Sequence, residues 1–129
     1  MRGYAAMTAH EVSEFLRSGV LDISDIYAPT ATFMAANSDL DEEEVEYTLS
    51  MVAAEDALEM RGEQSGTPCV LAFEIPDGAI ADSHDMSISL HSPLSWDAVQ
   101  CLFAVSEDGE ELTWFATQEI AQHIEEWLL

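Results

Sequence analysis

One short apolar run constrains the fold of this chain more than any other feature of its sequence. Residues 69–75 read CVLAFEI, in which Glu74 is the single charged side chain. A run of this length without helical or alternating periodicity is typical of a strand at the centre of a sheet. Pro68 precedes the run, and Pro76-Asp77-Gly78 follows it as a turn signal. We therefore expect a protein built around a β-sheet, with residues 69–75 as a central strand.

Four further segments follow a strand pattern. Residues 86–90 alternate apolar and polar side chains, and residues 99–105 and 111–116 each place apolar side chains on one face. The dipeptide Asp108-Gly109 lies between the last two segments and is a hairpin signal. Residues 2–6 are a weaker candidate for a short strand. At least one pair of strands is therefore expected to be antiparallel.

Three segments are expected to be helical. Thr8 and Glu11 have the spacing of a capping box, and Gly19 is placed to end the helix that they begin. The longest helix is expected over about residues 40–61, with acidic side chains in its first turn, where the helix dipole favours negative charge. A final helix is expected to begin at Thr117 as its cap.

The order of these elements is strand, helices, several strands and helix, which predicts an α+β fold. We expect a mainly antiparallel sheet of four to five strands with helices packed on one face. The length predicts a single domain over residues 1–129. Hydrophobic residues make up 48% of the chain, which is enough for a core and argues against disorder.

The expected long helix has apolar side chains on two sides. A helical wheel places one stripe opposite another: Val45, Leu49, Val52 and Met60 on one side, and Tyr47, Met51, Ala54 and Leu58 on the other. Such a helix is either sandwiched within its own domain or presents one face to a partner. Because most apolar stripes of helices belong to a core, we expect it to be sandwiched.

The charge balance is strongly acidic. The chain has 26 Asp and Glu residues against three Arg and no Lys, for a net charge of -23 at pH 7. Nucleic acids and anionic membranes are therefore excluded as direct partners, because both require a cationic surface. Three explanations for the charge stay open: a high-salt cytoplasm, a decoy surface for a protein that normally grips a polyanion, and compositional drift. No apolar run approaches the roughly 20 residues of a membrane span, and the N-terminus lacks the pattern of a signal peptide, so a cytoplasmic location is expected.

No group of residues indicates catalysis, a metal or a cofactor. Cys69 and Cys101 lie in strand-like runs without CxxC spacing, which predicts two reduced, buried thiols. His10 and Glu14 have an i, i+4 spacing that suits a metal, but no second pair of ligands accompanies them, so a solvated helix surface is expected. We expect a protein that is not an enzyme and that uses neither a metal nor a cofactor.

Four segments form a recognisable combination. They are Met1-Arg2-Gly3-Tyr4 followed by Thr8, the acidic helix start at residues 41–47, the strand and turn at residues 73–77, and Trp114-Phe115-Ala116-Thr117-Gln118-Glu119. This combination resembles an uncharacterised family of small actinobacterial proteins, a domain of unknown function. The resemblance spans nearly the whole chain, and its last motif is the most specific. It implies a lineage and a fold but no activity, because none is established for the family.

Two functions of different classes fit these observations. The first is a small acidic binding or inhibitory protein that docks on a basic protein surface, such as that of a nucleic-acid-binding protein, and mimics a nucleic acid. Its contacts are expected in a helix-start patch and a hairpin patch: Asp39, Asp41, Glu42, Glu43, Glu44 and Glu46 in the first, and Glu107, Asp108, Glu110 and Glu111 in the second. The alternative is a housekeeping small-ligand-binding or structural domain without a decoy role, with a pocket lined by Trp96, Trp114, Gln118 and Glu119.

Overall fold

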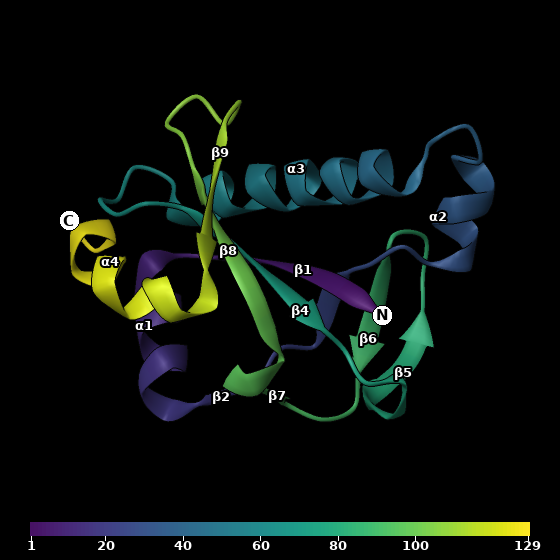
Figure 1. Cartoon of the computed structure of the whole chain (residues 1–129), viewed down its shortest axis with the longest axis horizontal. Helices are drawn as coiled ribbons and strands as arrows, with labels where there is room; N and C mark the ends of the chain where they lie inside the picture. The colour runs from purple at the N-terminus through teal and green to yellow at the C-terminus, as the bar shows by residue number, and fades with distance from the viewer.

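The computed structural model describes all 129 residues and contains a sheet of seven antiparallel strands (Figure 1). Their order across the sheet is β5 (Ile80–Ser83), β6 (Ser87–Leu90), β3 (Asp25–Tyr27), β1 (Arg2–Met7), β4 (Cys69–Glu74), β8 (Val99–Val105) and β9 (Leu112–Ala116). A separate ribbon pairs β2 (Val20–Leu21) with β7 (Leu94–Ser95). The predicted α+β class and antiparallel pairing are confirmed.

The expected number of four to five strands was too low. The pattern of the sequence missed β3 and β5, which have three and four residues. Strands this short do not extend far enough to show an alternation. Both strands are nevertheless paired: Ile26 of β3 lies opposite Ile88 of β6, and Ile80 of β5 lies opposite Leu90.

The strand β4 occupies the centre of the sheet, as its apolar run predicted. It pairs with β1 on one side and with β8 on the other, and its first five side chains are fully buried. Leu71 and Phe73 belong to one hydrophobic core, and Val70 and Ala72 belong to a second. Successive side chains of a strand point to opposite faces, so the two cores lie on opposite faces of the sheet.

Helices cover both faces of the sheet, and the expectation of helices on one face was wrong. The first core contains Phe15 of α1 (Ala9–Ser18) and Ile120 of α4 (Ile120–Trp127). The second contains Phe33 of α2 (Ala31–Ala36) and Leu49 of α3 (Glu42–Arg61), and Figure 1 shows α3 running across the sheet on the side away from α1. The physical reason is the central strand itself, because a strand that is apolar on both sides needs a layer on each.

The long helix α3 is packed on one side only, so it is not sandwiched. Ala53, Ala54 and Ala57 are fully buried, and these small side chains lie where the helix contacts the sheet. Tyr47 of the second stripe is 61% exposed, and Met60, at the C-terminal end of the first stripe, is 45% exposed. The second apolar stripe is therefore divided: Tyr47 lies at the surface, whereas Ala54 belongs to the second core and Leu58 packs against it.

The capping chemistry predicted for the first helix is found, and that predicted for the last helix is not. Thr8 with Glu11 begins α1 through a capping box, and Gly19 ends it in a left-handed conformation, φ 78°. Thr117 does not cap the last helix: its hydroxyl donates to the carbonyl of Val99, and a short 3-10 turn, Thr117–Glu119, comes before α4. No helix combines the length and the apolar character needed to cross a membrane.

The two cysteines are buried and free, as predicted. Cys69 belongs to the first core and Cys101 to the second, so the sheet separates them. Burial raises the pKa of the Cys69 thiol to about 12, and it also raises the pKa of Cys101. Both thiols are therefore protonated and unreactive near neutral pH.

Candidate docking face

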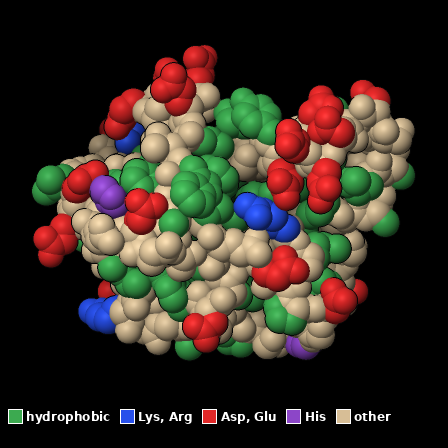
Figure 2. Space-filling view, in the orientation of Figure 1, with side chains coloured by type: hydrophobic (Ala, Val, Ile, Leu, Met, Phe, Trp, Pro, Cys, Tyr) green, Lys and Arg blue, Asp and Glu red, His purple; other side chains and the backbone are tan.

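The helix-start patch and the hairpin patch lie on either side of one groove. In the upper part of Figure 2, red side chains gather in two clusters, and green apolar side chains lie on the surface between them. Glu43 and Glu46 reach this groove from α3, and Glu110 reaches it from the loop between β8 and β9. Tyr47 and Met51 of α3 and Phe103 and Leu112 of the hairpin line its floor. The fold thus brings together carboxylates that lie more than 60 positions apart in the sequence.

Two exposed aromatic side chains stand at this groove. Tyr47 is 61% exposed, and Trp114 is 57% exposed on β9, directly opposite Phe103 of β8. We call the whole surface the docking face and define it by Glu43, Glu46, Tyr47, Met51, Phe103, Glu110, Leu112 and Trp114. Exposed aromatic residues within a charged rim are typical of protein-binding surfaces.

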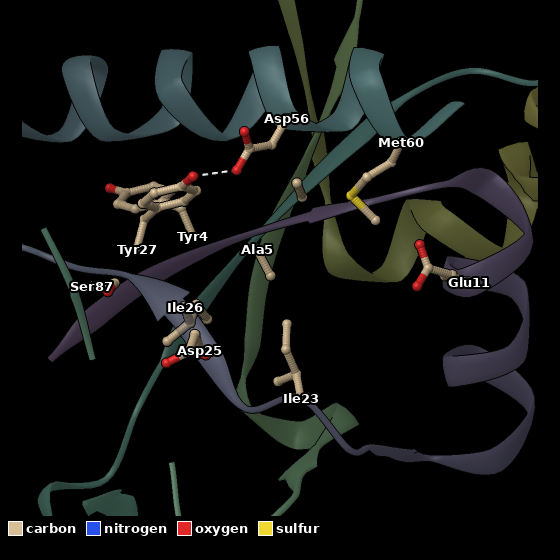
Figure 3. A pocket seen from close by; sticks show the side chains of 11 residues that line it. Tyr4, Ala5, Glu11, Ile23, Asp25, Ile26, Tyr27, Asp56, Met60 and Ser87 are labelled. Atoms are coloured by element: carbon tan, nitrogen blue, oxygen red, sulfur yellow. Dashed lines mark hydrogen bonds between the residues drawn. The ribbon is translucent and has the colours of Figure 1, made fainter. Parts of the chain in front are cut away.

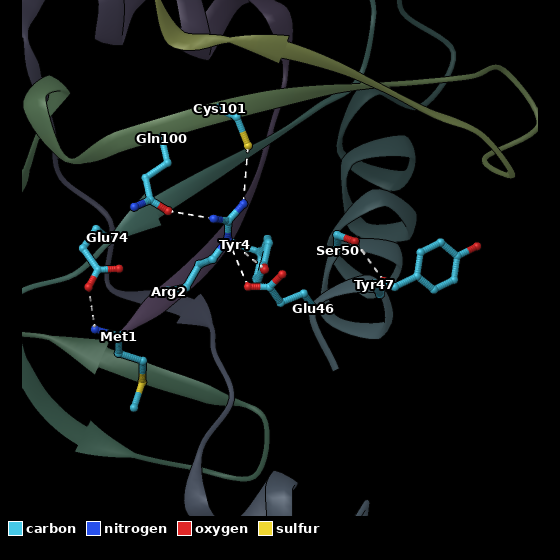
Figure 4. Close-up of polar contacts among 9 residues, drawn as sticks. All are labelled: Met1, Arg2, Tyr4, Glu46, Tyr47, Ser50, Glu74, Gln100 and Cys101. Atoms are coloured by element: carbon cyan, nitrogen blue, oxygen red, sulfur yellow. Dashed lines mark hydrogen bonds and ion pairs between the residues drawn. The ribbon is translucent and has the colours of Figure 1, made fainter. Parts of the chain in front are cut away.

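Arg2 is the only cationic residue that lines the groove, and its guanidinium is already bound by neighbouring side chains (Figure 4). Its guanidinium donates to Gln100 Oε1 at 2.9 Å and to the Tyr4 hydroxyl at 3.1 Å, and Nε lies 3.7 Å from Glu46 Oε1. Burial raises the pKa of Tyr4 to about 12, so its hydroxyl stays neutral. Three carboxylates against one guanidinium leave the groove negative.

The hairpin patch is partly structural. Arg61 at the end of α3 donates to both carboxylate oxygens of Glu107, at 3.0 and 3.2 Å, and these bonds lower the pKa of Glu107. The carboxylate of Asp108 accepts the Ser106 hydroxyl and the backbone N–H of Glu110, which lowers its pKa. Glu107 and Asp108 therefore fix the loop, while the carboxylates of Glu110 and Glu111 are exposed to solvent.

The helix-start patch is divided in the same way. Asp41 and Glu44 form a capping box, in which each carboxylate accepts the backbone N–H of the other residue at 2.8 and 3.1 Å. Asp39, Glu42 and Glu43 are exposed and make no hydrogen bond through their side chains. Sequence reasoning identified the acidic residues of both patches but could not separate capping carboxylates from outward ones.

The pocket expected from Trp96, Trp114, Gln118 and Glu119 does not form. Trp96 packs edge-on against Phe15, with ring centroids 4.9 Å apart, on the face covered by α1. Trp114 lies on the opposite face, because it pairs with Phe103, which packs against the second core. Glu119 instead accepts the backbone N–H of Ala116 at 2.9 Å, and Gln118 is exposed. The sheet separates the two tryptophans, so they cannot line one site.

A second cavity, which the sequence gave no reason to expect, lies where β1 and β3 diverge (Figure 3). The two strands pair only at Tyr4 and Tyr27, and beyond this point the cleft opens to about 420 Å³. The Tyr27 hydroxyl donates to the carboxylate of Asp56 on α3. The pKa of Tyr27 is raised to about 12, mainly by burial and secondly by this bond to Asp56. No three His, Cys, Asp or Glu side chains meet in a geometry that could hold a metal ion.

Fold and surface together define a small acidic α+β protein with one aromatic groove between carboxylates. The chain belongs to a family of unknown function, DUF6912, whose model matches residues 1–110. Searches of curated proteins and of solved structures found no match. The family match includes α3 and both acidic patches up to Glu110, but it ends before the Trp114–Glu119 motif on which the resemblance relied most.

Proposed function

We propose that this protein is a small acidic binding or inhibitory protein that docks on a basic surface of a partner protein. The observation that carries the proposal is the docking face, where Tyr47 and Trp114 are exposed within a rim of carboxylates from two distant segments. Aromatic anchors supply most of the affinity at protein interfaces, and the rim selects the sign of the partner's charge. We place the protein in the cytoplasm and its family in actinobacteria.

The charge supports this kind of partner on kinetic grounds as well. A net charge of -23 produces a field that accelerates encounter with a cationic surface at low ionic strength. A groove that normally holds DNA or RNA is such a surface, and carboxylates can replace the phosphates there. The proposed partner is therefore a nucleic-acid-binding protein. This chain would bind in its nucleic-acid groove as a mimic of the nucleic acid.

The proposal is tested by capture from a host lysate at about 0.1 M and about 0.5 M salt, a change that shortens the screening length by roughly half. The test variant is Tyr47→Ala/Trp114→Ala, and the matched control is Val20→Ala/Leu129→Ala, which truncates exposed apolar side chains outside the docking face. We expect one basic protein to be retained at low salt by wild type and control, and to be lost at high salt and with the test variant. Equal retention by both variants would contradict the proposal.

A small-ligand-binding module is the second candidate, and the cleft between β1 and β3 is the observation that favours it. A small molecule bound there would contact Tyr27 and Asp56 rather than the docking face (Figure 3). Amide chemical-shift changes at these two residues on addition of host metabolite extract, with none at Tyr47, would favour this candidate over the first.

A further inference from the structure

The strand β9 is an edge strand of the sheet, and its sequence has no feature that would prevent pairing with another strand. It is the last strand of the order, so no strand pairs with its outer side. Edge strands are commonly blunted by charges, proline or bulges. The opposite edge, β5, has Asp82 and a register shift after Ile80, whereas β9 reads LTWFA without a charge or a proline.

The hydrogen bonds of the β8–β9 hairpin show which backbone groups face outward. The N–H of Ser106 donates to the carbonyl of Glu111 at 2.9 Å, while the N–H of Val105 donates away from β9, to Pro68. Because hydrogen bonding to the neighbouring strand alternates along an antiparallel pair, the N–H and C=O of Glu111, Thr113 and Phe115 point toward β8. The N–H and C=O of Leu112 and Trp114 point to the free edge.

Side chains add a charge preference to this edge. Trp114 lies at its middle and is 57% exposed. Glu110 and Glu111 are exposed just before the strand, and Glu119 ends the edge by accepting the N–H of Ala116. An incoming strand would thus meet the unpaired N–H and C=O groups of two residues, an exposed indole ring and carboxylates.

We propose that the partner contributes an extended cationic segment that adds to the sheet as a strand beside β9. This inference rests on the proposed function and specifies how docking occurs. Backbone hydrogen bonds to Leu112 and Trp114 hold the added strand, as in other cases of β-augmentation. Arginine or lysine side chains of that strand lie over the Trp114 ring and beside Glu110 and Glu111, where a cation–π contact and ion pairs form.

A second copy of this chain is the less suitable occupant of the same edge. Two copies would each carry a net charge of -23, and pairing of β9 with β9 would bring Glu110 and Glu111 of both near the same strands. Repulsion between the two strongly negative copies opposes this pairing. Charge complementarity therefore selects a cationic strand.

The test uses a defined probe, an acetylated and amidated hexapeptide of alternating arginine and valine. Hydrogen exchange by NMR follows each amide of β9 in the whole protein. Without peptide, the amides of Thr113 and Phe115 are expected to be protected, and those of Leu112 and Trp114 to exchange freely. With peptide, the last two amides become protected, and Trp114→Ala weakens peptide binding about fivefold through loss of the cation–π contact.

Two control peptides separate strand addition from simple charge attraction. N-methylation of the two central residues blocks both edges of the peptide and is expected to weaken binding about tenfold or more. The same hexapeptide with glutamate in place of arginine is expected not to bind. Val20→Ala, which truncates an exposed side chain on β2 outside the docking face, should not change the protection of Leu112 and Trp114.

The outcomes distinguish this inference from the proposed function. Peptide binding that shifts the amide resonance of Tyr47 but leaves the Leu112 and Trp114 amides unprotected would overturn strand addition. Docking on a basic partner would be left in place. Concentration-dependent protection of those amides without peptide would show a second copy at the edge and would also overturn the inference. Failure of the lysate capture, in contrast, would remove the proposed function.

Discussion

At the scale of single residues, the loop between β8 and β9 shows how the fold fixes one side of the docking face. Gly109 has φ 75°, and a Cβ at this position would lie 2.6 Å from Leu58 Cδ1 on α3. The loop therefore lies against the C-terminal half of α3, where Arg61 also holds Glu107. Its carboxylates are presented from a turn that these contacts hold against the helix.

Gly109→Ala should lower the free energy of unfolding by about 1–2 kcal/mol, because the left-handed backbone costs this much for a residue with a Cβ. The contact with Leu58 adds to the loss. Gly78→Ala is the control, since a Cβ there meets nothing within 4 Å. Urea unfolding measures both, and equal stability of the two variants would show that the loop is not fixed as described.

Glu107 gives the loop a defined dependence on pH. Its pKa is lowered from the ordinary 4.5 by the hydrogen bonds from Arg61, so its contribution to stability is present above pH 4.5 and is lost as the pH falls through the lowered value. The difference in unfolding free energy between wild type and Glu107→Gln should therefore disappear in acid. Glu111→Gln, which removes a carboxylate without a hydrogen bond, should show no such difference, and a Glu107→Gln effect that grows in acid would contradict this account.

At the scale of elements, the close approach of α3 to the sheet depends on its alanines. Ala53 is fully buried in the second core, so Ala53→Leu would force three extra carbon atoms between helix and sheet. We expect a loss of about 1–3 kcal/mol, the usual cost of overpacking. Ala121→Leu on the exposed side of α4 is the control, and thermal unfolding compares them. An Ala53→Leu variant as stable as this control would mean that α3 does not pack as described.

The same elements show what the sequence could predict and what it could not. The apolar run of β4 predicted a central strand, and its two-sided burial explains why helices cover both faces. The three residues of β3 gave no periodic signal, so the predicted number of strands was too low. For the site, acidity predicted the rim, but pairing of Glu107 with Arg61 and the separation of Trp96 from Trp114 depend on tertiary contacts that no local pattern contains.

At the scale of the whole molecule, the net charge of -23 opposes folding through repulsion among carboxylates. The unfolding midpoint should therefore rise with NaCl, with most of the gain complete by about 0.2 M, where the screening length is below about 8 Å. Calorimetry between about 0.02 and 2 M NaCl measures it. A midpoint that keeps rising steeply to molar salt would instead support adaptation to a high-salt cytoplasm as the origin of the charge.

The most direct measurement of the central claim is the association rate constant between this protein and its captured partner, determined for two charge variants. Glu43→Gln/Glu110→Gln removes two charges from the docking face, and Asp82→Asn/Glu125→Gln removes two exposed charges elsewhere. Docking through this face predicts that the first pair slows association more than the second, and that the difference shrinks at about 0.5 M salt. Equal rates for the two variants at low salt would contradict the claim that partners dock on this face.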